Sequence, residues 1–201
     1  MTAMDRPEGT EAVPSRGAAA AVQVSADEAD PSREAFSGWT WNPSRALIAT
    51  LRDYDEVRGS RRPDRILRRW LAIVRHRFWS VVCGADIPIG SHIARGFQLP
   101  HPNGVVIHPD ARIGVNCLLF QQVTLGTGGP VPGAPVLEGH VDVGAGAKVL
   151  GGVRVGRHAV IGANAVVLCD VPAGATAVGV PARVIEAAQG VESTVAGATG
   201  R

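Results

Sequence analysis

His101 stands between two prolines, in Pro100-His101-Pro102, at a point where a regular pattern of aliphatic residues is broken. Arg95 breaks the same pattern six residues earlier. Function is expected where an otherwise regular repeat departs from its rule. An imidazole with a pKa of about 6.5 can accept a proton from a reacting group at neutral pH, so His101 is a candidate for acid–base chemistry.

The three cysteines, Cys83, Cys117 and Cys169, are odd in number and widely spaced, with no CxxC pair. They indicate neither a disulfide framework nor a zinc site, and no metal is expected. A reducing cytoplasm suits them, and residues 1–31 are acidic and lack the apolar core of a secretory signal. The net charge of +2 and the absence of an apolar run of ~18 residues argue against nucleic acid and membrane partners.

The pattern that His101 interrupts is a six-residue repeat over residues 85–185. A large aliphatic residue returns at every sixth position, often followed by glycine, and a second small or apolar residue follows four positions later. Two inward positions per six residues are typical of a hexapeptide β-helix, in which three hexapeptides form one coil of a triangular prism. The large aliphatic positions are Ile89, Ile107, Ile113, Leu119, Leu125, Leu137, Val143, Val149, Val155, Ile161 and Val167. The second positions are Ile93, Leu99, Val105, Ala111, Cys117, Val123, Val141, Ala147, Val153, Ala159, Ala165 and Val171.

Residues 126–135 interrupt this repeat with glycines and prolines, which cannot form a strand. We therefore expect an extruded loop, after which the repeat resumes in phase. The whole chain of 201 residues divides into four expected segments. These are a disordered segment over 1–38, a helical region over 39–84, the β-helix over 85–185 and a disordered tail over 186–201.

Two helices are predicted ahead of the prism. One starts at Asn42-Pro43, where an N-cap precedes a proline in the first turn, and the other starts at Pro63 and ends near Val82. The second helical region is rich in arginine and contains Trp70 and Trp79. Binding to a nucleic acid or an anionic surface is one interpretation, but a solvated helix face is the plainer one, and the aromatic residues are expected to pack against the end of the prism. The arginines are Arg58, Arg61, Arg62, Arg65, Arg68, Arg69, Arg75 and Arg77.

Four segments between Asp86 and Ile185 carry recognisable motifs: LPHPNGVVI at 99–107, FQQVTLG at 120–126, VGAGAKVLG at 143–151 and GVPARVI at 179–185. They resemble the serine O-acetyltransferases of the hexapeptide acyltransferase superfamily. This resemblance implies a mainly β fold, a left-handed parallel β-helix with a short N-terminal helical region. It also implies acetyl-CoA as donor, a small-molecule hydroxyl as acceptor, and a homotrimer with active sites between neighbouring prisms.

By the same resemblance, His101 is the general base and Asp86 is the carboxylate that pairs with it. An alcohol is too weakly acidic to attack a thioester unaided at neutral pH, so such a base is needed. Asp86 precedes His101 by fifteen residues, close to one coil, so adjacent turns can bring the two together and the carboxylate can fix the imidazole tautomer. The resemblance places the donor along a prism edge, with contacts at Gly126, Thr127, Ala145, Lys148, Ala163 and Arg183.

The chain departs from the family pattern at three positions. Gly133 and Ala134 replace an arginine and a second catalytic histidine, and Pro100 replaces an aspartate. These groups help to bind the amino acid, so their loss removes charge partners for serine. The helical region is also shorter than in members that form hexamers, which favours a trimer. The chain ends at Arg201 rather than at the isoleucine that docks onto cysteine synthase, so no such complex is expected.

Three functions remain open from the sequence. The first is serine O-acetyltransferase, which converts acetyl-CoA and L-serine to O-acetyl-L-serine and CoA in cysteine biosynthesis, by direct transfer in a ternary complex. The second is the same chemistry on a sugar, a polysaccharide precursor or another small-molecule hydroxyl. The third is a non-enzymatic trimeric scaffold whose helices bind a partner.

Overall fold

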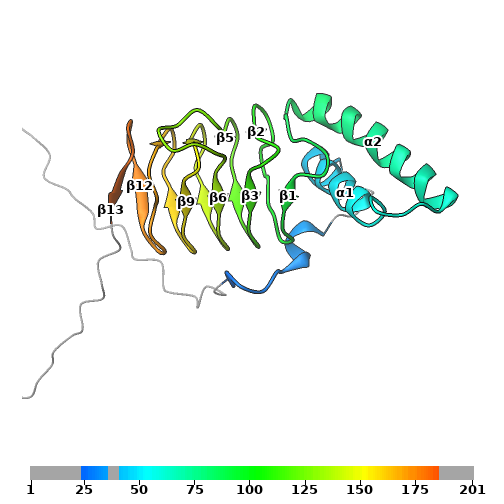
Figure 1. Cartoon of the computed structure of the whole chain (residues 1–201), viewed down its shortest axis with the longest axis horizontal. Helices are drawn as coiled ribbons and strands as arrows, with labels where there is room; N and C mark the ends of the chain where they lie inside the picture. Colours follow the sequence, from blue (N-terminus) through cyan, green and yellow to red (C-terminus); the bar gives the residue numbers. More distant parts are fainter. Residues whose placement is uncertain (1–23, 36–40, 186–201) are drawn as a thin grey trace, which may run out of the picture.

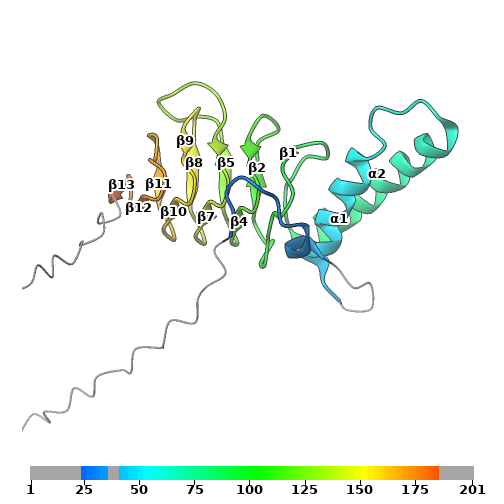
Figure 2. The same ribbon diagram turned by 90° about the horizontal axis from the view of Figure 1, so that it is seen from below.

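The computed structural model describes residues 24–35 and 41–185. They form a triangular prism of short strands with two helices at the end where strand β1 lies (Figure 1). The view from below shows the same order, with both helices at that end (Figure 2). The predictions of disorder for residues 1–23, 36–38 and 186–201 lie outside the described residues. Within the described part, no helix is long and apolar enough to cross a membrane.

Three sheets form the faces of the prism, and from β2 to β11 consecutive strands lie on successive faces. One face has the strand order β1-β3-β6-β9, the second β4-β7-β10-β12, and the third β2-β5-β8-β11, all parallel, while β13 closes the second sheet by pairing antiparallel with β12. The strands are β1 His92–Ile93, β2 Val106–Ile107, β3 Arg112–Ile113, β4 Leu118–Leu119, β5 Thr124–Gly126, β6 Val136–Leu137, β7 Asp142–Val143, β8 Lys148–Leu150, β9 Arg154–Val155, β10 Val160–Ile161, β11 Val166–Val167, β12 Thr176–Val178 and β13 Arg183–Ile185.

The core of the prism is the aliphatic ladder that the sequence predicted. Both series of predicted inward residues are buried from Val105 to Val171, with exposures of 3% or less. Regular coils repeat after 18 residues, as in the pairing of Val136 with Arg154 (154 − 136). Stacking identical positions at this interval buries each aliphatic side chain against its counterparts in the coils above and below.

The first coil is longer than the others. Asp86 bridges to Val106, and Ile93 pairs with Ile113, so each partner lies 20 residues ahead (106 − 86 and 113 − 93). Ile93 therefore fills the position that the six-residue frame assigned to Arg95, and Arg95 is exposed at a corner. Ile93 and Leu99 are buried as predicted, but the large aliphatic positions of this coil lie two residues from where the frame put them, and Ile89, predicted inward, is only partly buried.

The two extra residues lie in the corner that carries His101. The buried residues Ile87, Ile93 and Leu99 follow one another at six-residue intervals, but the next inward residue of this series, Ile107, comes eight residues after Leu99. The step from Leu99 to Ile107 contains the turn 100–104, where His101 is exposed. His101 therefore projects from an enlarged corner rather than occupying a failed core position.

Both helices begin at the residues that the sequence predicted. Helix α1 spans Pro43–Asp55, and its N-cap Asn42 accepts a hydrogen bond from the backbone N–H of Arg45 at 3.1 Å. Helix α2 spans Pro63–Cys83 and ends at Gly84, which has a φ of 61°, a conformation that favours glycine. The two helices pack against each other, and Leu47, Ile48 and Leu51 of α1 join the prism core.

A buried histidine ties these elements together. His76 of α2 donates from Nε2 to the carbonyl oxygen of Ile87 in the first coil at 2.7 Å, and its Nδ1 lies 3.0 Å from the hydroxyl of Thr50 in α1. Burial lowers the pKa of His76. Trp79 packs against the core as predicted, but Trp70 is 60% exposed, so the prediction that it packs against the prism is wrong.

Residues 24–35, called the strap here, lie along the prism and contain the 3₁₀ helix η1, Pro31–Glu34. The side chain of Asn116 holds the strap by bonding to three of its backbone groups. Glu34 forms a salt bridge of 2.6 Å with Arg52 of α1 and accepts a hydrogen bond from the backbone N–H of Phe97 at 3.0 Å. The sequence predicted disorder here, and the structure differs because polar contacts rather than a periodic apolar pattern hold the segment.

Candidate active site

The turn 100–104 lies at the end of the first coil, next to the residue that ends α2. The backbone N–H of Gly104 donates to the carbonyl oxygen of Gly84 at 2.8 Å, and that of Val105 donates to Pro102 at 3.2 Å. Gly104 has a φ of 70°, which the crowded turn requires. The imidazole of His101 is exposed, with its ring centre 6.4 Å from that of Phe120 in the next coil. The turn therefore presents an accessible base on a backbone that is fixed at both ends.

His101 opens into a cavity of about 490 Å³ between the helices and the prism. The start of α1, the end of α2 and the His101 turn each contribute a wall. His101 is the one titratable side chain other than a cysteine among the lining residues described, and none of the others carries a charge. The lining residues are Trp41, Asn42, Pro43, Ser44, Val82, Cys83, Pro100, His101, Pro102 and Asn103.

Trp41, Val82 and Asn103 were not predicted as site residues. The sequence indicated where α1 starts and where α2 ends, but it carried no signal that the two helix ends converge on His101. Such convergence depends on the crossing of α1 over α2, which a periodic pattern along one helix does not determine.

Cys83 and Ser44 do not compete with His101 as reactive groups in this cavity. Burial raises the pKa of the Cys83 thiol to about 11, so the sulfur stays protonated at neutral pH and is a poor nucleophile. The Ser44 hydroxyl is buried and donates to the carbonyl oxygen of Leu99. The lining thus contains a base but no activated nucleophile, which suits direct transfer rather than a covalent intermediate.

Asp86 lies at the start of the coil that ends with the His101 turn. Its backbone N–H donates to Val105 at 2.8 Å, directly after that turn, and its side chain is exposed. Among the described residues, no hydrogen bond or ion pair joins Asp86 to His101. The two residues share one coil rather than lying on adjacent turns, and the pairing of their side chains stays a prediction.

Two of the six predicted donor contacts lie on the same prism edge as His101, and a third lies beside it. This edge, called the His101 edge here, consists of the successive corners 100–104, 120–123, 144–147 and 162–165. Ala145 and Ala163 are stacked there, since the backbone N–H of Asn164 donates to Ala145 at 2.8 Å. The Lys148 ammonium donates to the carbonyl oxygens of Gln122 at 3.0 Å and Gly146 at 2.7 Å, so it lies beside the same corners.

Close packing along the His101 edge depends on Gly144. A Cβ on this residue would lie 2.6 Å from the backbone nitrogen of Ala163, a contact that real Cβ atoms essentially never make. The corners 144–147 and 162–165 therefore consist of small residues and closely packed backbone, apart from Asn164, which permits a ligand to approach the backbone closely there.

The other predicted donor contacts lie elsewhere in the chain. Gly126 ends β5, and Thr127 begins the extruded loop 127–135, which lies at the corner between β5 and β6, one edge away from His101. The loop is packed rather than free, since Gly152 donates to Val131 at 2.9 Å. Arg183 lies on β13, next to Val178 of β12. One chain by itself does not bring these residues together with His101.

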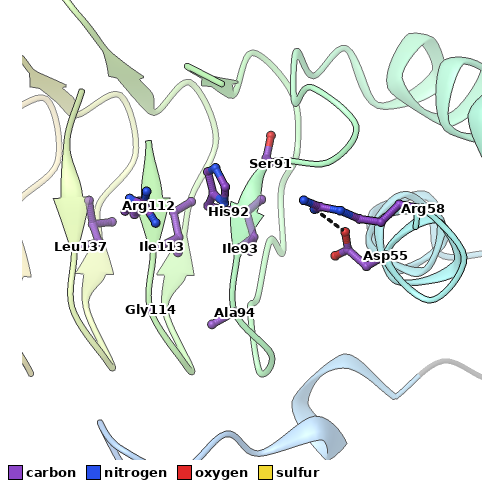
Figure 3. A pocket seen from close by; sticks show the side chains of 10 residues that line it. All are labelled: Asp55, Arg58, Ser91, His92, Ile93, Ala94, Arg112, Ile113, Gly114 and Leu137. Carbon is purple, nitrogen blue, oxygen red and sulfur yellow. Dashed lines mark hydrogen bonds and ion pairs between the residues drawn. The ribbon is translucent and has the colours of Figure 1, made fainter. Parts of the chain in front are cut away.

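A second cavity, of about 620 Å³, is larger but contains none of the predicted site residues. It lies where the end of α1 faces β1, β3 and β6, and Figure 3 shows Arg58 beside Asp55, opposite His92 and Arg112. Arg58 is paired with Asp55 at 3.4 Å. Because none of the residues that the sequence motifs single out lines this cavity, it is not the candidate for catalysis.

The chain is similar to known proteins at the level of solved structures. No protein-family model matches the chain, and no curated protein sequence matches it. Solved serine acetyltransferases do match: the soybean apoenzyme (35% identity, TM-score 0.57), the Neisseria gonorrhoeae enzyme in complex with serine (32%, 0.60) and the Brucella abortus strain S19 enzyme in complex with coenzyme A (31%, 0.61). The matches cover 71%, 71% and 73% of this chain, and 56%, 57% and 57% of those chains.

The prism is therefore the left-handed parallel β-helix of the hexapeptide-repeat acyltransferases. Within that class the solved structures that the chain matches are serine acetyltransferases, the family that the sequence motifs predicted. The chain spans somewhat more than half the length of the solved members that it matches.

Proposed function

We propose that the chain is an acetyl-CoA-dependent O-acetyltransferase with His101 as its general base. The imidazole takes the proton of an acceptor hydroxyl as its oxygen attacks the acetyl carbonyl carbon. The carbon–sulfur bond of the thioester then breaks, and the CoA sulfur leaves with the proton from His101. The observation that carries this proposal is the enlarged corner, which presents His101 to a cavity at the start of the His101 edge.

The donor is proposed to lie along the His101 edge, where Ala145 and Ala163 permit close approach. Solved serine acetyltransferases with the same fold include complexes with CoA, which supports this choice of donor. Because Gly126 and Thr127 lie on a different edge of the same chain, a neighbouring chain of a homotrimer would supply them. Lys148 would contribute positive charge at the edge for an anionic donor.

L-Serine is the first acceptor proposed, which would give O-acetyl-L-serine in a cytoplasmic pathway to cysteine. Solved neighbours in complex with serine and with cysteine support an amino acid acceptor. The second candidate is an uncharged hydroxyl acceptor such as a sugar. It is favoured by the lining of the His101 cavity, which offers no charged side chain to pair with the ammonium and carboxylate of serine.

A CoA-release assay with L-serine and a panel of sugars distinguishes these acceptors. We expect His101→Ala to lower kcat at least ~10²-fold with the preferred acceptor, because the hydroxyl then lacks a base. The matched variant is His92→Ala, an exposed histidine of β1 outside the His101 cavity, which should leave kcat unchanged. Rapid turnover of a sugar with none of serine would select the second candidate, and a chain that does not bind acetyl-CoA would leave only the scaffold function.

A further inference from the structure

The outward face of α2 exposes six large apolar side chains in one continuous stripe. Five of them follow one another at alternating steps of four and three residues, which aligns them along one side of a helix. Exposures run from 54% for Leu71 to 83% for Val81, while Ala72 and His76 on the opposite side are buried. The members of this α2 stripe are Leu67, Trp70, Leu71, Val74, Phe78 and Val81.

Arginines border the α2 stripe on both sides. At about 100° per residue, Arg68 and Arg75 lie along one border and Arg77 along the other. Arg75 pairs with Asp53 at 2.7 Å and Arg68 with Glu56 at 3.8 Å, but each of these side chains is at least 41% exposed, so the pairs are weak and the guanidinium groups remain accessible. Past the first turn, α2 contains no acidic residue.

We propose that the α2 stripe binds the surface of an anionic membrane, with the helix lying in the plane of the interface. The nearly balanced net charge and the lack of a spanning run argued against a membrane partner, and this local surface is the exception. Bulky apolar side chains on one face, a tryptophan at the margin and arginines along both borders form the pattern of an interfacial helix. The apolar side chains would enter the boundary between headgroups and acyl chains, and the flexible stems of the arginines would let their guanidinium groups reach lipid phosphates.

Charge argues against a second α2 as the partner. If two α2 helices met along the stripe, Arg68, Arg75 and Arg77 would flank the seam on both sides, and like charges would face each other. A nucleic acid would engage the arginines but leave the six apolar side chains in water. An anionic membrane can bury the apolar side chains of the stripe and also pair its lipid phosphates with the arginines along the borders.

The position of α2 connects this surface to the candidate active site. Val82 and Cys83, at the end of α2, line the cavity beside His101. Both views place α2 at the end of the prism, away from the later coils (Figures 1 and 2). Binding through the stripe would hold the mouth of the cavity close to the membrane surface while the remaining coils extend away from β1.

The test is co-sedimentation of the full chain with phosphatidylcholine vesicles, with and without about 30% phosphatidylglycerol. We expect binding to the anionic vesicles only, and its loss at about 0.5 M salt, where screening is nearly complete. Val74→Asp should lower the partition constant at least ~10-fold by placing a carboxylate in the stripe. Val160→Asp, an equal change at a residue 43% exposed on the prism, should leave binding unchanged.

Three results would overturn the proposal. The first is that the wild-type chain stays in the supernatant with anionic vesicles, and the second is that Val160→Asp and Val74→Asp weaken binding equally. The third is self-association in sedimentation velocity that Val74→Asp abolishes, without vesicle binding, which would assign the stripe to a second copy. Circular dichroism monitors folding, and if Val74→Asp unfolds, the double variant Leu71→Ala and Phe78→Ala, both exposed, replaces it.

Discussion

One side chain, that of Asn116, holds the strap on the prism. It is fully buried at a corner and has a φ of 60°. Its Nδ2 donates to the carbonyl oxygens of Ser25 and Glu28, both at 2.8 Å, and its Oδ1 accepts from the backbone N–H of Asp30 at 2.8 Å. Replacing Asn116 by glycine removes these three bonds and keeps the backbone conformation, because glycine adopts a positive φ without strain.

The free energy of strap docking that Asn116→Gly should lose follows from those three hydrogen bonds. At about 0.5–1.5 kcal/mol each, they contribute roughly 1.5–4.5 kcal/mol to docking of the strap. The lower part of this range applies, since the released strap groups can bond to water, so about 2 kcal/mol is expected. Asn116→Ala should cost about 1–2 kcal/mol more, because alanine resists a positive φ, and that extra cost should appear in global stability rather than in strap docking.

Amide hydrogen exchange measured by NMR checks this prediction. A loss of about 2 kcal/mol corresponds to roughly 30-fold faster exchange of the Asp30 amide in Asn116→Gly, while the amide of Leu119 in the prism core should exchange as in the wild type. Unchanged protection of Asp30 in Asn116→Gly would refute the reasoning. Equal acceleration at Asp30 and Leu119 would also refute it, because the side chain would then support the prism rather than the strap.

Three further predictions concern the core and the His101 edge. Burial lowers the pKa of His76, so the unfolded chain binds a proton at this residue more readily than the folded chain does. The free energy of unfolding should therefore fall as the pH drops below about 6.5. Urea titrations at pH 7 and pH 5 measure this dependence, and His76→Gln should flatten it. Phe97→Ala, at a fully buried position, should cost about 3–5 kcal/mol by urea unfolding, against less than about 0.5 kcal/mol for the exposed His92→Ala. Gly144→Ala should weaken acetyl-CoA binding measured by calorimetry, because its methyl group would lie 2.6 Å from the Ala163 nitrogen and displace the His101 edge; undiminished affinity would contradict the assignment of that edge.

The regular coils were predictable because their inward positions repeat without interruption. From Val105 onward each coil confirms the frame of the last, and the repeat itself determines the register. The inward residues of the first coil were harder to predict, because Ile87 and Ile89 both fit an aliphatic position. The sequence does not show which of the two points inward. Pairing of Ile93 with Ile113 in the structure resolves this choice, and it moves the irregularity into the His101 corner.

The strap and the outward face of α2 were not predictable for different reasons. Asn116 binds backbone groups of the strap, which are common to every sequence and leave no pattern in residues 24–35. Helix α2 has apolar residues on two sides, and periodicity shows that a face exists without showing what covers it. In the structure Trp79 takes the inward side and Trp70 the outward one.

Every coil of the prism has an even length. The paired positions are separated by 20 residues at Ile93, by 24 across the loop at Arg112, by 18 at Val136 and by 16 at Val160. The extra and missing residues lie at corners and in the extruded loop, outside the strand ladders, so each strand keeps its pairing and its inward residues. The corners can therefore change in length, which makes them natural positions for grafting a longer acceptor loop without redesigning the core.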